Sequence, residues 1–546
     1  MRSVRLIPAI AALLLASLGI RAAATGAPAA QTPPAPAPAM PAAGAAPAGP
    51  PARSGRPNPT ATLYGVVCAG CHGTAISAGP RAPSLFDDQW AHGGNDDAIL
   101  TSIRDGFPAA GMPPFKASMT DQEIWQMVAY LRNQAAALKE KPQYVPDPDG
   151  QIVKSEKQTF KVEIVARNLE TPWGLAFLPD GRLLITERPG TLRIVDKRLK
   201  MSDPVKGLPK VWEKQDGGLF DVEVHPNYAR NGWIYLSYSE TLPGYVAPPP
   251  PAPADTTPTA PATANTPTPP QGGGRGRGGP PDPPSMTVIV RGRINNRNEW
   301  VDQQVLFRAP AAIYNSSNAH YGSRFIFDRE NHLFFSIGEK QQMMDAQDLS
   351  KPTGKIHRVN DDGSIPKDNP FVGKAGAVES IWSYGHRNPQ GLAWDPVSGK
   401  LWESEHGPQG GDEINVIEKG RNYGWGVITM GLQQGITKRS EPGMEQPIVY
   451  YTPTIAPSGI AFYTGDRYPA WKNNLFVSAL AGQQLRRLEI SGGTVTHQEA
   501  VFNQFGRVHD VIVGPDGLLY VTLQLPGQVL SQSTPGMVAR LVPVQQ

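Results

Sequence analysis

The sequence predicts a mainly β protein, a six-bladed β-propeller preceded by a small all-α domain. Two observations carry this prediction: a turn-plus-strand unit that recurs after residue 158, and an amphipathic helical segment before it. Each copy of the unit is a turn rich in Pro, Asp, Gly or Asn followed by a hydrophobic strand, and the copies lie at 178–188, 225–239, 327–339, 394–408, 468–480 and 514–523. Such repeats are typical of four-stranded propeller blades. A generic β-sandwich is the alternative, but the period is too long for a single hairpin.

The chain begins with the features of an export signal. Arg2 and Arg5 precede the apolar run LIPAIAALLLASLGI, and small residues follow it. This pattern predicts a signal peptide over 1–24 and a soluble, periplasmic mature protein. The run is short for a membrane span, so a retained anchor is the alternative and no stable membrane insertion is expected after cleavage.

Composition limits the possible partners and the source of stability. The 546 residues carry a formal net charge of +3. A chain of this length is expected to contain more than one domain, and its nearly balanced charge gives no support for a nucleic-acid partner. With two cysteines, an exported protein of this size cannot depend on a disulfide framework, so its core must be held by packing.

Two low-complexity segments divide the chain. Residues 25–59 are almost only Ala, Pro and Gly and predict an extended linker. The Pro/Gly-rich stretch 246–284 lies between two strand-like runs, which predicts a disordered insertion within a sheet. Residues 139–157 are the predicted link between the helical domain, 60–138, and the propeller, 158–546.

The helical domain contains one strongly amphipathic segment, 121–136. Thr120, with Glu123 three positions later, predicts a capping box at its start. The helical spacing of apolar residues places on one face Ile124, Met127, Val128 and Leu131.

The two cysteines lie in the stretch VVCAGCHGT. Cys68 and Cys71 are followed directly by His72, the pattern that attaches c-type haem through two thioether bonds and places the imidazole under the iron. A thioredoxin-like redox pair would need a βαβ setting, whereas these flanks are helical and Gly-rich. The sequence therefore predicts a covalently bound haem c with His72 as an iron ligand.

The sixth iron ligand is expected later in the same domain. GFPAAGMPPF presents Met112 in a loop rich in Gly and Pro, and Met119 is the alternative. His/Met ligation raises the reduction potential, which suits an acceptor of electrons from an organic donor. The segment 60–138 resembles a small class I cytochrome c.

The propeller contains no GxGxxG, P-loop or GxSxG motif, so nicotinamide, nucleotide and serine-hydrolase chemistry have no local support. Its polar clusters follow strands, and propeller loops converge on one face around the central channel. These clusters include NAHYGSR (318–324), YGHRNPQGLAWD (384–395), SEHGPQGGDEIN (404–415), TPTIAPSG (452–459) and GRVHDV (506–511).

Together these stretches resemble the soluble PQQ-dependent glucose/sorbosone (aldose sugar) dehydrogenase family over nearly all of 160–540. The resemblance implies PQQ and calcium as cofactors and a sugar as substrate. It implies that His320, with Arg324 four residues on, is the general base that takes the hydroxyl proton. Glu339 stands where the family has an Asp that orients this His, and its extra methylene is expected to affect the pair.

The resemblance also implies a cofactor site. Arg387 and Asn388 match the residues at the reactive quinone carbonyls, and Thr454 and Arg507 match positions that contact the cofactor carboxylates. The backbone carbonyls of Gly407 and Pro408 match the calcium ligands, with Asp412 and Glu413 as acidic neighbours.

Three positions depart from the glucose-oxidising pattern. Asp216 replaces an expected Gln, Ala481 an expected Lys and His509 an expected Arg. Asp216 and His509 are still expected to contact PQQ. The loss of two cations is expected to weaken PQQ binding unless Gln and His side chains, among them Gln483 and Gln484, compensate.

The leading hypothesis is a periplasmic quinohaemoprotein that oxidises an aldose sugar or related alcohol with PQQ and passes the electrons to its own haem c. A cytochrome or an oxidase would be the downstream acceptor. The alternative is a carbohydrate-binding or degenerate propeller that serves as a scaffold for an electron-carrier cytochrome c. A lactonase-type hydrolase would have no use for a haem. The natural substrate and the oligomeric state, a homodimer included, stay open.

Overall fold

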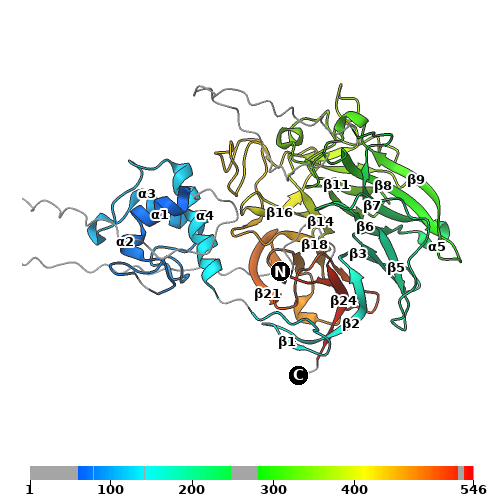
Figure 1. The fold of residues 1–546 in the computed structure, drawn as a ribbon, viewed down its shortest axis with the longest axis horizontal. Helices are drawn as coiled ribbons and strands as arrows, with labels where there is room; N and C mark the ends of the chain where they lie inside the picture. The colour runs from blue at the N-terminus through cyan, green and yellow to red at the C-terminus, as the bar shows by residue number, and fades with distance from the viewer. Residues whose placement is uncertain (1–58, 78, 140–141, 248–280, 527–533, 545–546) are drawn as a thin grey trace, which may run out of the picture. The chain divides into compact units, whose positions relative to one another are not determined.

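The computed structural model describes residues 59–77, 79–139, 142–247, 281–526 and 534–544 (Figure 1). The predicted signal peptide 1–24, residues 25–58 of the predicted linker and residues 248–280 of the predicted insertion lie outside these described residues. Within the described part of the chain, no helix is both long and apolar enough to cross a bilayer.

Helices dominate residues 59–138, as predicted. They are α1 (Pro59–Val67), α2 (Ala69–His72), α3 (Asp96–Asp105), the 3-10 turn η1 (Pro108–Ala110) and α4 (Asp121–Leu138). The predicted capping box of α4 is confirmed, because Glu123 N donates to Thr120 Oγ1 at 3.3 Å and Thr120 N donates to the Glu123 carboxylate at 2.8 Å. The apolar face of α4 is buried, and the core of these helices includes Tyr64, Ile99, Ile124, Met127, Val128 and Leu131.

The strands form six antiparallel sheets among the described residues, which confirms the predicted six-bladed propeller (Figure 1). Blade one contains β3 (Pro172–Phe177), β4 (Leu183–Glu187) and β5 (Thr191–Val195). Blade two contains β6 (Leu219–Val224), β7 (Ile234–Thr241), β8 (Ser285–Ile294) and β9 (Trp300–Arg308). Blade three contains β10 (Gly322–Phe327), β11 (Leu333–Ile337), β12 (Lys355–Val359) and β13 (Ile381–Tyr384).

The last three blades complete the ring. Blade four contains β14 (Pro389–Trp394), β15 (Leu401–Glu405), β16 (Asp412–Ile417) and β17 (Val449–Tyr451). Blade five contains β18 (Pro457–Phe462), β19 (Leu475–Ala479), β20 (Gln484–Ser491) and β21 (Thr494–Phe502). Blade six contains β22 (Val511–Val513), β23 (Leu519–Gln524), β24 (Pro535–Pro543), β2 (Thr159–Glu170) and β1 (Ile152–Lys154). The short helix α5 (Tyr228–Asn231) and the 3-10 turns η2 (Ala311–Ile313), η3 (Met343–Ala346) and η4 (Pro469–Trp471) lie between strands.

Each repeated turn-plus-strand unit supplies the second strand of one blade. The six strands that arise in this way are β4, β7, β11, β15, β19 and β23. Their central positions in each sheet explain why the sequence repeats are hydrophobic, since both faces of such a strand pack against neighbouring blades. The predicted insertion joins β7 to β8, which are paired neighbours in one sheet.

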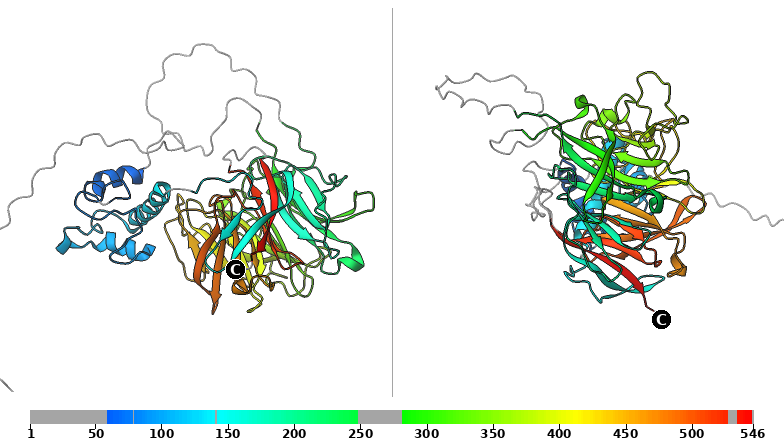
Figure 2. Two further views of the ribbon diagram at one scale, coloured as in Figure 1. Left: turned by 90° about the horizontal axis from the view of Figure 1, so that it is seen from below. Right: turned by 90° about the vertical axis from the view of Figure 1, so that its right-hand side faces the viewer.

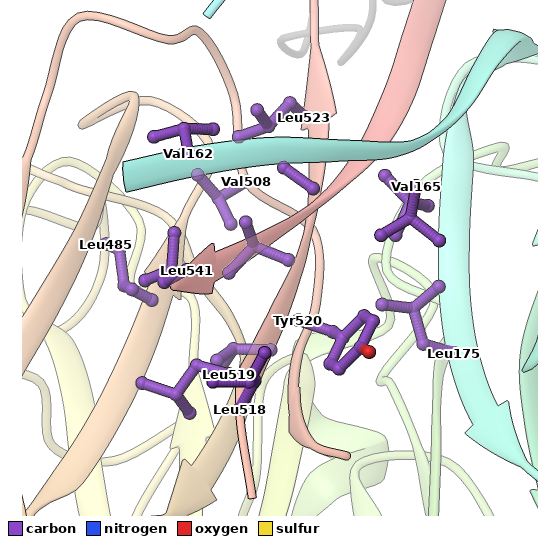
Figure 3. Packing of buried hydrophobic residues seen from close by; sticks show 14 of the residues in the cluster. Val162, Val165, Leu175, Leu485, Val508, Leu518, Leu519, Tyr520, Leu523 and Leu541 are labelled. Atoms are coloured by element: carbon purple, nitrogen blue, oxygen red, sulfur yellow. The ribbon is translucent and has the colours of Figure 1, made fainter. Parts of the chain in front are cut away.

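Blade six closes the ring with strands from both ends of the propeller sequence. β2 and β24 lie side by side as antiparallel neighbours (Figure 2). In this pairing Val162 is opposite Leu541. Figure 3 shows Val162 and Leu541 in one apolar cluster with Leu519 and Leu523 of β23. Because this sheet joins residues nearly 400 positions apart, the ring closes only when both ends of the propeller have folded.

A buried arginine ties the blades together at the centre. The innermost strands β3, β6, β10, β14, β18 and β22 contact one another in ring order. Arg324 Nη1 of β10 lies 3.0 Å from Asp221 Oδ1 of β6 and 3.1 Å from Asp510 Oδ1 beside β22. Its guanidinium also lies over the ring of Trp173 of β3, 4.3 Å from the centroid, and Nε donates to the carbonyl of Gln390 at 2.8 Å. One side chain thus contacts residues of four other blades.

Replacing Arg324 by Met is expected to lower the free energy of unfolding by about 3–5 kcal/mol, because two buried carboxylates lose their counter-ion. Denaturant unfolding followed by tryptophan fluorescence measures this change. The control is Arg421→Met, whose exposed side chain makes only long ion pairs of 3.5 and 3.9 Å and whose loss should change stability by less than about 1 kcal/mol. Equal effects of the two variants would contradict a central role for Arg324.

Candidate functional site

The predicted base and its partner lie in neighbouring loops of blade three. His320 lies two residues before β10 and Glu339 two residues after β11, and strand pairing puts Gly322 opposite Ile337. The His320 Nδ1 and Glu339 Oε1 atoms are hydrogen-bonded. The structure therefore brings the pair together although Glu339 replaces the expected Asp.

The backbone at His320 is held in a conformation that residues other than glycine rarely adopt. Its φ is +58°, in the left-handed region. The strained turn is kept by two hydrogen bonds, from His320 N to Asp216 Oδ2 at 3.3 Å and from Lys340 N to the His320 carbonyl at 3.3 Å. Strain of this kind is concentrated at functional sites. With Nδ1–H donated to Glu339, the lone pair of Nε2 is available to accept a proton.

Arg387 and Asn388 lie between β13 and β14, next to this pair. The Arg387 carbonyl accepts from Glu339 N at 2.9 Å, and Arg387 Nη1 donates to the carbonyl of His406 at 3.1 Å. Asn388 Oδ1 accepts from Gly322 N at 3.1 Å, so it also holds the start of β10. Burial lowers the pKa of Arg387, and the nearby carboxylates, Glu339 first among them, oppose that shift.

One buried carboxylate organises the loops that contain Gly407 and Thr454. Asp412 Oδ1 accepts from Gly407 N at 2.9 Å. Its Oδ2 accepts from the hydroxyl of Thr454 at 2.6 Å and from the backbone N of Ile455 and Ala456, both at 2.7 Å. Asp412 therefore fixes the predicted calcium loop of blade four against the predicted cofactor loop before blade five.

Two arginines and a histidine gather at the predicted carboxylate contacts. Arg507 and His509 lie just before β22, and burial lowers the pKa of both side chains. The positive charge of Arg188, at the end of β4, lowers both pKa values further. Arg188 was absent from the sequence prediction because it follows an ordinary β-strand. It supplies a cation close enough to act on His509, the position where the family pattern has an Arg.

His406 is a second functional candidate that the sequence reasoning missed. Its Nδ1 lies 3.4 Å from Asn388 Nδ2, and the charges of Asp412, Arg387, Asp216 and His320 all act on it. Burial lowers the pKa of His406 to about 4, so the imidazole is neutral at physiological pH. Its position inside the predicted calcium motif EHGPQGGDE, directly before Gly407, is the signal that could have identified it.

The side chains around these loops fit an anionic, planar quinone. Among the described residues, four buried polar atoms here have no hydrogen-bond partner: Glu339 Oε2, Arg387 Nε, His406 Nε2 and His509 Nδ1. Buried polar atoms without partners favour a polar ligand. The arginines at 188, 387 and 507 match the carboxylates and carbonyls of PQQ, and the carbonyls of Gly407 and Pro408 are donors of the type that Ca²⁺ prefers.

The three residues of the haem-binding motif lie in and directly before the short helix α2. Cys68 precedes α2, and the backbone N of Cys71 and His72 donate to its carbonyl at 3.1 and 3.0 Å. His72 Nδ1 is hydrogen-bonded to the carbonyl of Pro83 at 2.8 Å, which orients the ring and leaves Nε2 for the iron. Met112 lies in the loop after η1, in a backbone bridge with Phe107.

Met112 and Met119 differ in their surroundings. Met119 is a buried member of the helical core. Met112 is only partly buried and packs against the same core as Cys68. These positions favour Met112 as the iron ligand and Met119 as a packing residue, as the sequence predicts.

Comparisons with known proteins match both parts of the chain. Residues 169–531 match the family described as Glucose / Sorbosone dehydrogenase. Residues 55–131 match the family described as Cytochrome C oxidase, cbb3-type, subunit III.

Individual relatives cover the propeller. The aldose sugar dehydrogenase YliI of Escherichia coli is 38% identical over 385 residues, which cover 69% of this chain and 93% of the relative. Quinoprotein glucose dehydrogenase B of Acinetobacter calcoaceticus is 27% identical, over 70% of this chain and 90% of the relative. The apo crystal structure of the soluble aldose sugar dehydrogenase from Escherichia coli aligns with a TM-score of 0.59 and 35% identity, over 70% of this chain and all of that one.

Proposed function

Because the chain belongs to the glucose/sorbosone dehydrogenase family, we propose that it oxidises an aldose sugar or related alcohol in the periplasm and passes the electrons to its own haem c. The chain is an oxidoreductase of the sugar dehydrogenase type, with PQQ and haem c as cofactors. When bound, PQQ supplies a two-electron acceptor and haem c a one-electron acceptor. The observation that carries the proposal is the hydrogen-bonded pair of the partly buried His320 and the buried Glu339 beside Arg387.

His320 is the general base of this proposal. Nε2 takes the proton of the sugar hydroxyl, which makes the adjacent C–H bond a better hydride donor. The Glu339 carboxylate keeps Nδ1 protonated and stabilises the imidazolium that forms. Oxidation of the sugar carbon releases two electrons in all.

The remaining side chains would bind the PQQ cofactor and orient it toward the sugar. Arg387 and Asn388 would hold the quinone carbonyls, where a cation and an amide stabilise developing negative charge. Arg507, Arg188 and Thr454 would hold the carboxylates, with Asp216 and His509 at the edge of the site. The carbonyls of Gly407 and Pro408 would hold Ca²⁺ against the same ligand.

The test is the absorption spectrum of the full chain, reconstituted with PQQ and CaCl₂ and mixed with a panel of aldoses and polyols. We expect the reduced α-band of the haem to grow with at least one sugar, at a rate independent of protein concentration. PQQ absorbance should remain after desalting, at one equivalent per chain. Turnover with an added dye acceptor but without haem reduction would refute internal electron transfer alone. No reaction with any sugar or polyol would refute sugar oxidation.

A further inference from the structure

Lys340 is a fully buried lysine directly after Glu339, with 0% of its surface exposed. Its Nζ donates to the carbonyl of Ser317 and lies 3.4 Å from the centroid of the Tyr321 ring. Its backbone N donates to the carbonyl of His320. Lys340 therefore contacts the loop of the proposed base at three points: Ser317 before it, His320 itself and Tyr321 after it.

A second buried lysine shows what is unusual about this ammonium group. Lys355 Nζ donates to the carbonyls of Asp345, Ala346 and Thr353 at 2.7, 3.1 and 2.7 Å, so its three protons all have acceptors. Lys340 Nζ has one carbonyl acceptor and an aromatic face, and the carboxylates of Asp216 and Glu339 supply its balancing charge. A buried ammonium group needs such compensation.

We propose that Lys340 is a positioning residue of the sugar-oxidising site, which fixes the loop of His320 and places a positive charge beside the His320–Glu339 pair. This inference rests on the proposed function of His320 as the base. Through Ser317, Tyr321 and the backbone of His320, the side chain and main chain of Lys340 hold the strained turn. The charge acts on the carboxylate that orients the imidazole.

The charge on Lys340 changes near neutrality. Burial lowers the pKa of Lys340 to about 7, against the opposing effect of Asp216 and Glu339. Below that pH the ammonium group disfavours a second positive charge on the nearby imidazole. Several titratable or charged groups surround Lys340 and the carboxylates that balance its charge. Glu339 lies on the loop of Lys340 itself. The others come from neighbouring loops: His320 and Tyr321 before β10, Asp216 before β6, Asp282 before β8, Arg387 before β14 and His406 after β15.

The test compares pH profiles of kcat for the unaltered chain and Lys340→Met, between about pH 5 and about pH 9, with a dye acceptor. Without the cation, protonation of the base becomes easier, so the acid limb should move to higher pH by about half a unit to one unit. The plateau kcat should fall about tenfold, with KM for the sugar changed less than about threefold. Coincident acid limbs would overturn the inference.

Two further variants separate the charge from the contacts. Lys340→Gln keeps a donor for Ser317 and removes the charge, so it should shift the acid limb while retaining more of kcat than Lys340→Met. Gln341→Ala removes the acceptor of the Ser317 hydroxyl, at 2.9 Å, and leaves every charge in place. It should leave the acid limb where it is, and a shift as large as that of Lys340→Gln would overturn the role of the charge.

A stability measurement on the PQQ-free chain gives a readout without catalysis. Because the pKa of Lys340 is near 7 in the folded chain and about 10.5 unfolded, the unfolded state binds more protons between these values. The unaltered chain should therefore gain stability over Lys340→Met as the pH rises from about 7 to about 10. Equal stability of the two chains at every pH would overturn the inference, because neither the contacts nor the charge of Lys340 would then act on the loop. Absence of sugar turnover in the unaltered chain would refute the proposed function, and this inference with it, even with the stability difference present.

Discussion

Replacing His320 by Gln is expected to lower sugar-dependent kcat by about 10²- to 10⁴-fold, the usual contribution of a general base. Gln has no group that accepts a proton near neutral pH, and its amide still fits the space before β10. PQQ affinity should change little, because the cations at Arg188, Arg387 and Arg507 remain. Steady-state rates with a dye acceptor and a PQQ titration of the same preparation measure both effects.

Variants of Glu339, the hydrogen-bond partner of His320, are the matched comparison for His320→Gln. Glu339 is buried, and its Oε1 meets His320 Nδ1, so Glu339→Gln removes the carboxylate that stabilises the imidazolium. It should lower kcat less than His320→Gln does, while Glu339→Asp, which keeps the carboxylate, should retain more activity than Glu339→Gln. Unchanged rates in His320→Gln would remove its assigned role.

Replacing Asp412 by Ala is expected to abolish tight binding of PQQ with calcium, a loss of at least about 100-fold in affinity. The donors on Gly407, Thr454 and Ile455 would lose their acceptor, and Ala456 N would keep only its bond of 3.3 Å to Thr454 Oγ1. Each orphaned donor costs about 1–3 kcal/mol, and the two loops would no longer be held together. Equilibrium dialysis against PQQ with CaCl₂ measures the loss.

The control for this prediction lies at the other end of the same blade. Asp395 is a buried aspartate in the turn between β14 and β15, where it accepts from Val397 N at 2.9 Å. Asp395→Ala should lower stability and leave PQQ affinity unchanged, since it holds a turn remote from the loops of Gly407 and Thr454. Equal loss of PQQ in both variants would show that Asp412 acts through general destabilisation.

Local patterns in the sequence were sufficient for the blades and for haem attachment. The turn residues and the hydrophobic strand of each repeat are contiguous, and all six repeats became the second strands of blades. The motif from Cys68 to His72 is also contiguous, and the cap from Thr120 to Glu123 lies within one turn of helix. Such features depend on short-range sterics and hydrogen bonds, which the sequence states directly.

The propeller site was predictable only through resemblance to a family, which identified His320, Arg387 and Gly407. The family resemblance does not point to Arg188, His406 or Lys340. No sequence motif identifies an arginine after a strand, a histidine in a loop or a buried lysine as a site residue. Their importance comes from neighbours brought in by other blades, such as Asp216 for Lys340 and Arg507 for Arg188.

The kind of blade, the number of blades and the covalent haem motif follow from the order of residue types along the chain. The closure of the ring, through β2 against β24, and the buried charges that meet around His320 follow only from the folded chain. Strand and turn preferences act over a few residues. Burial and charge pairing instead depend on contacts between residues more than a hundred positions apart, as between Asp216 and His320.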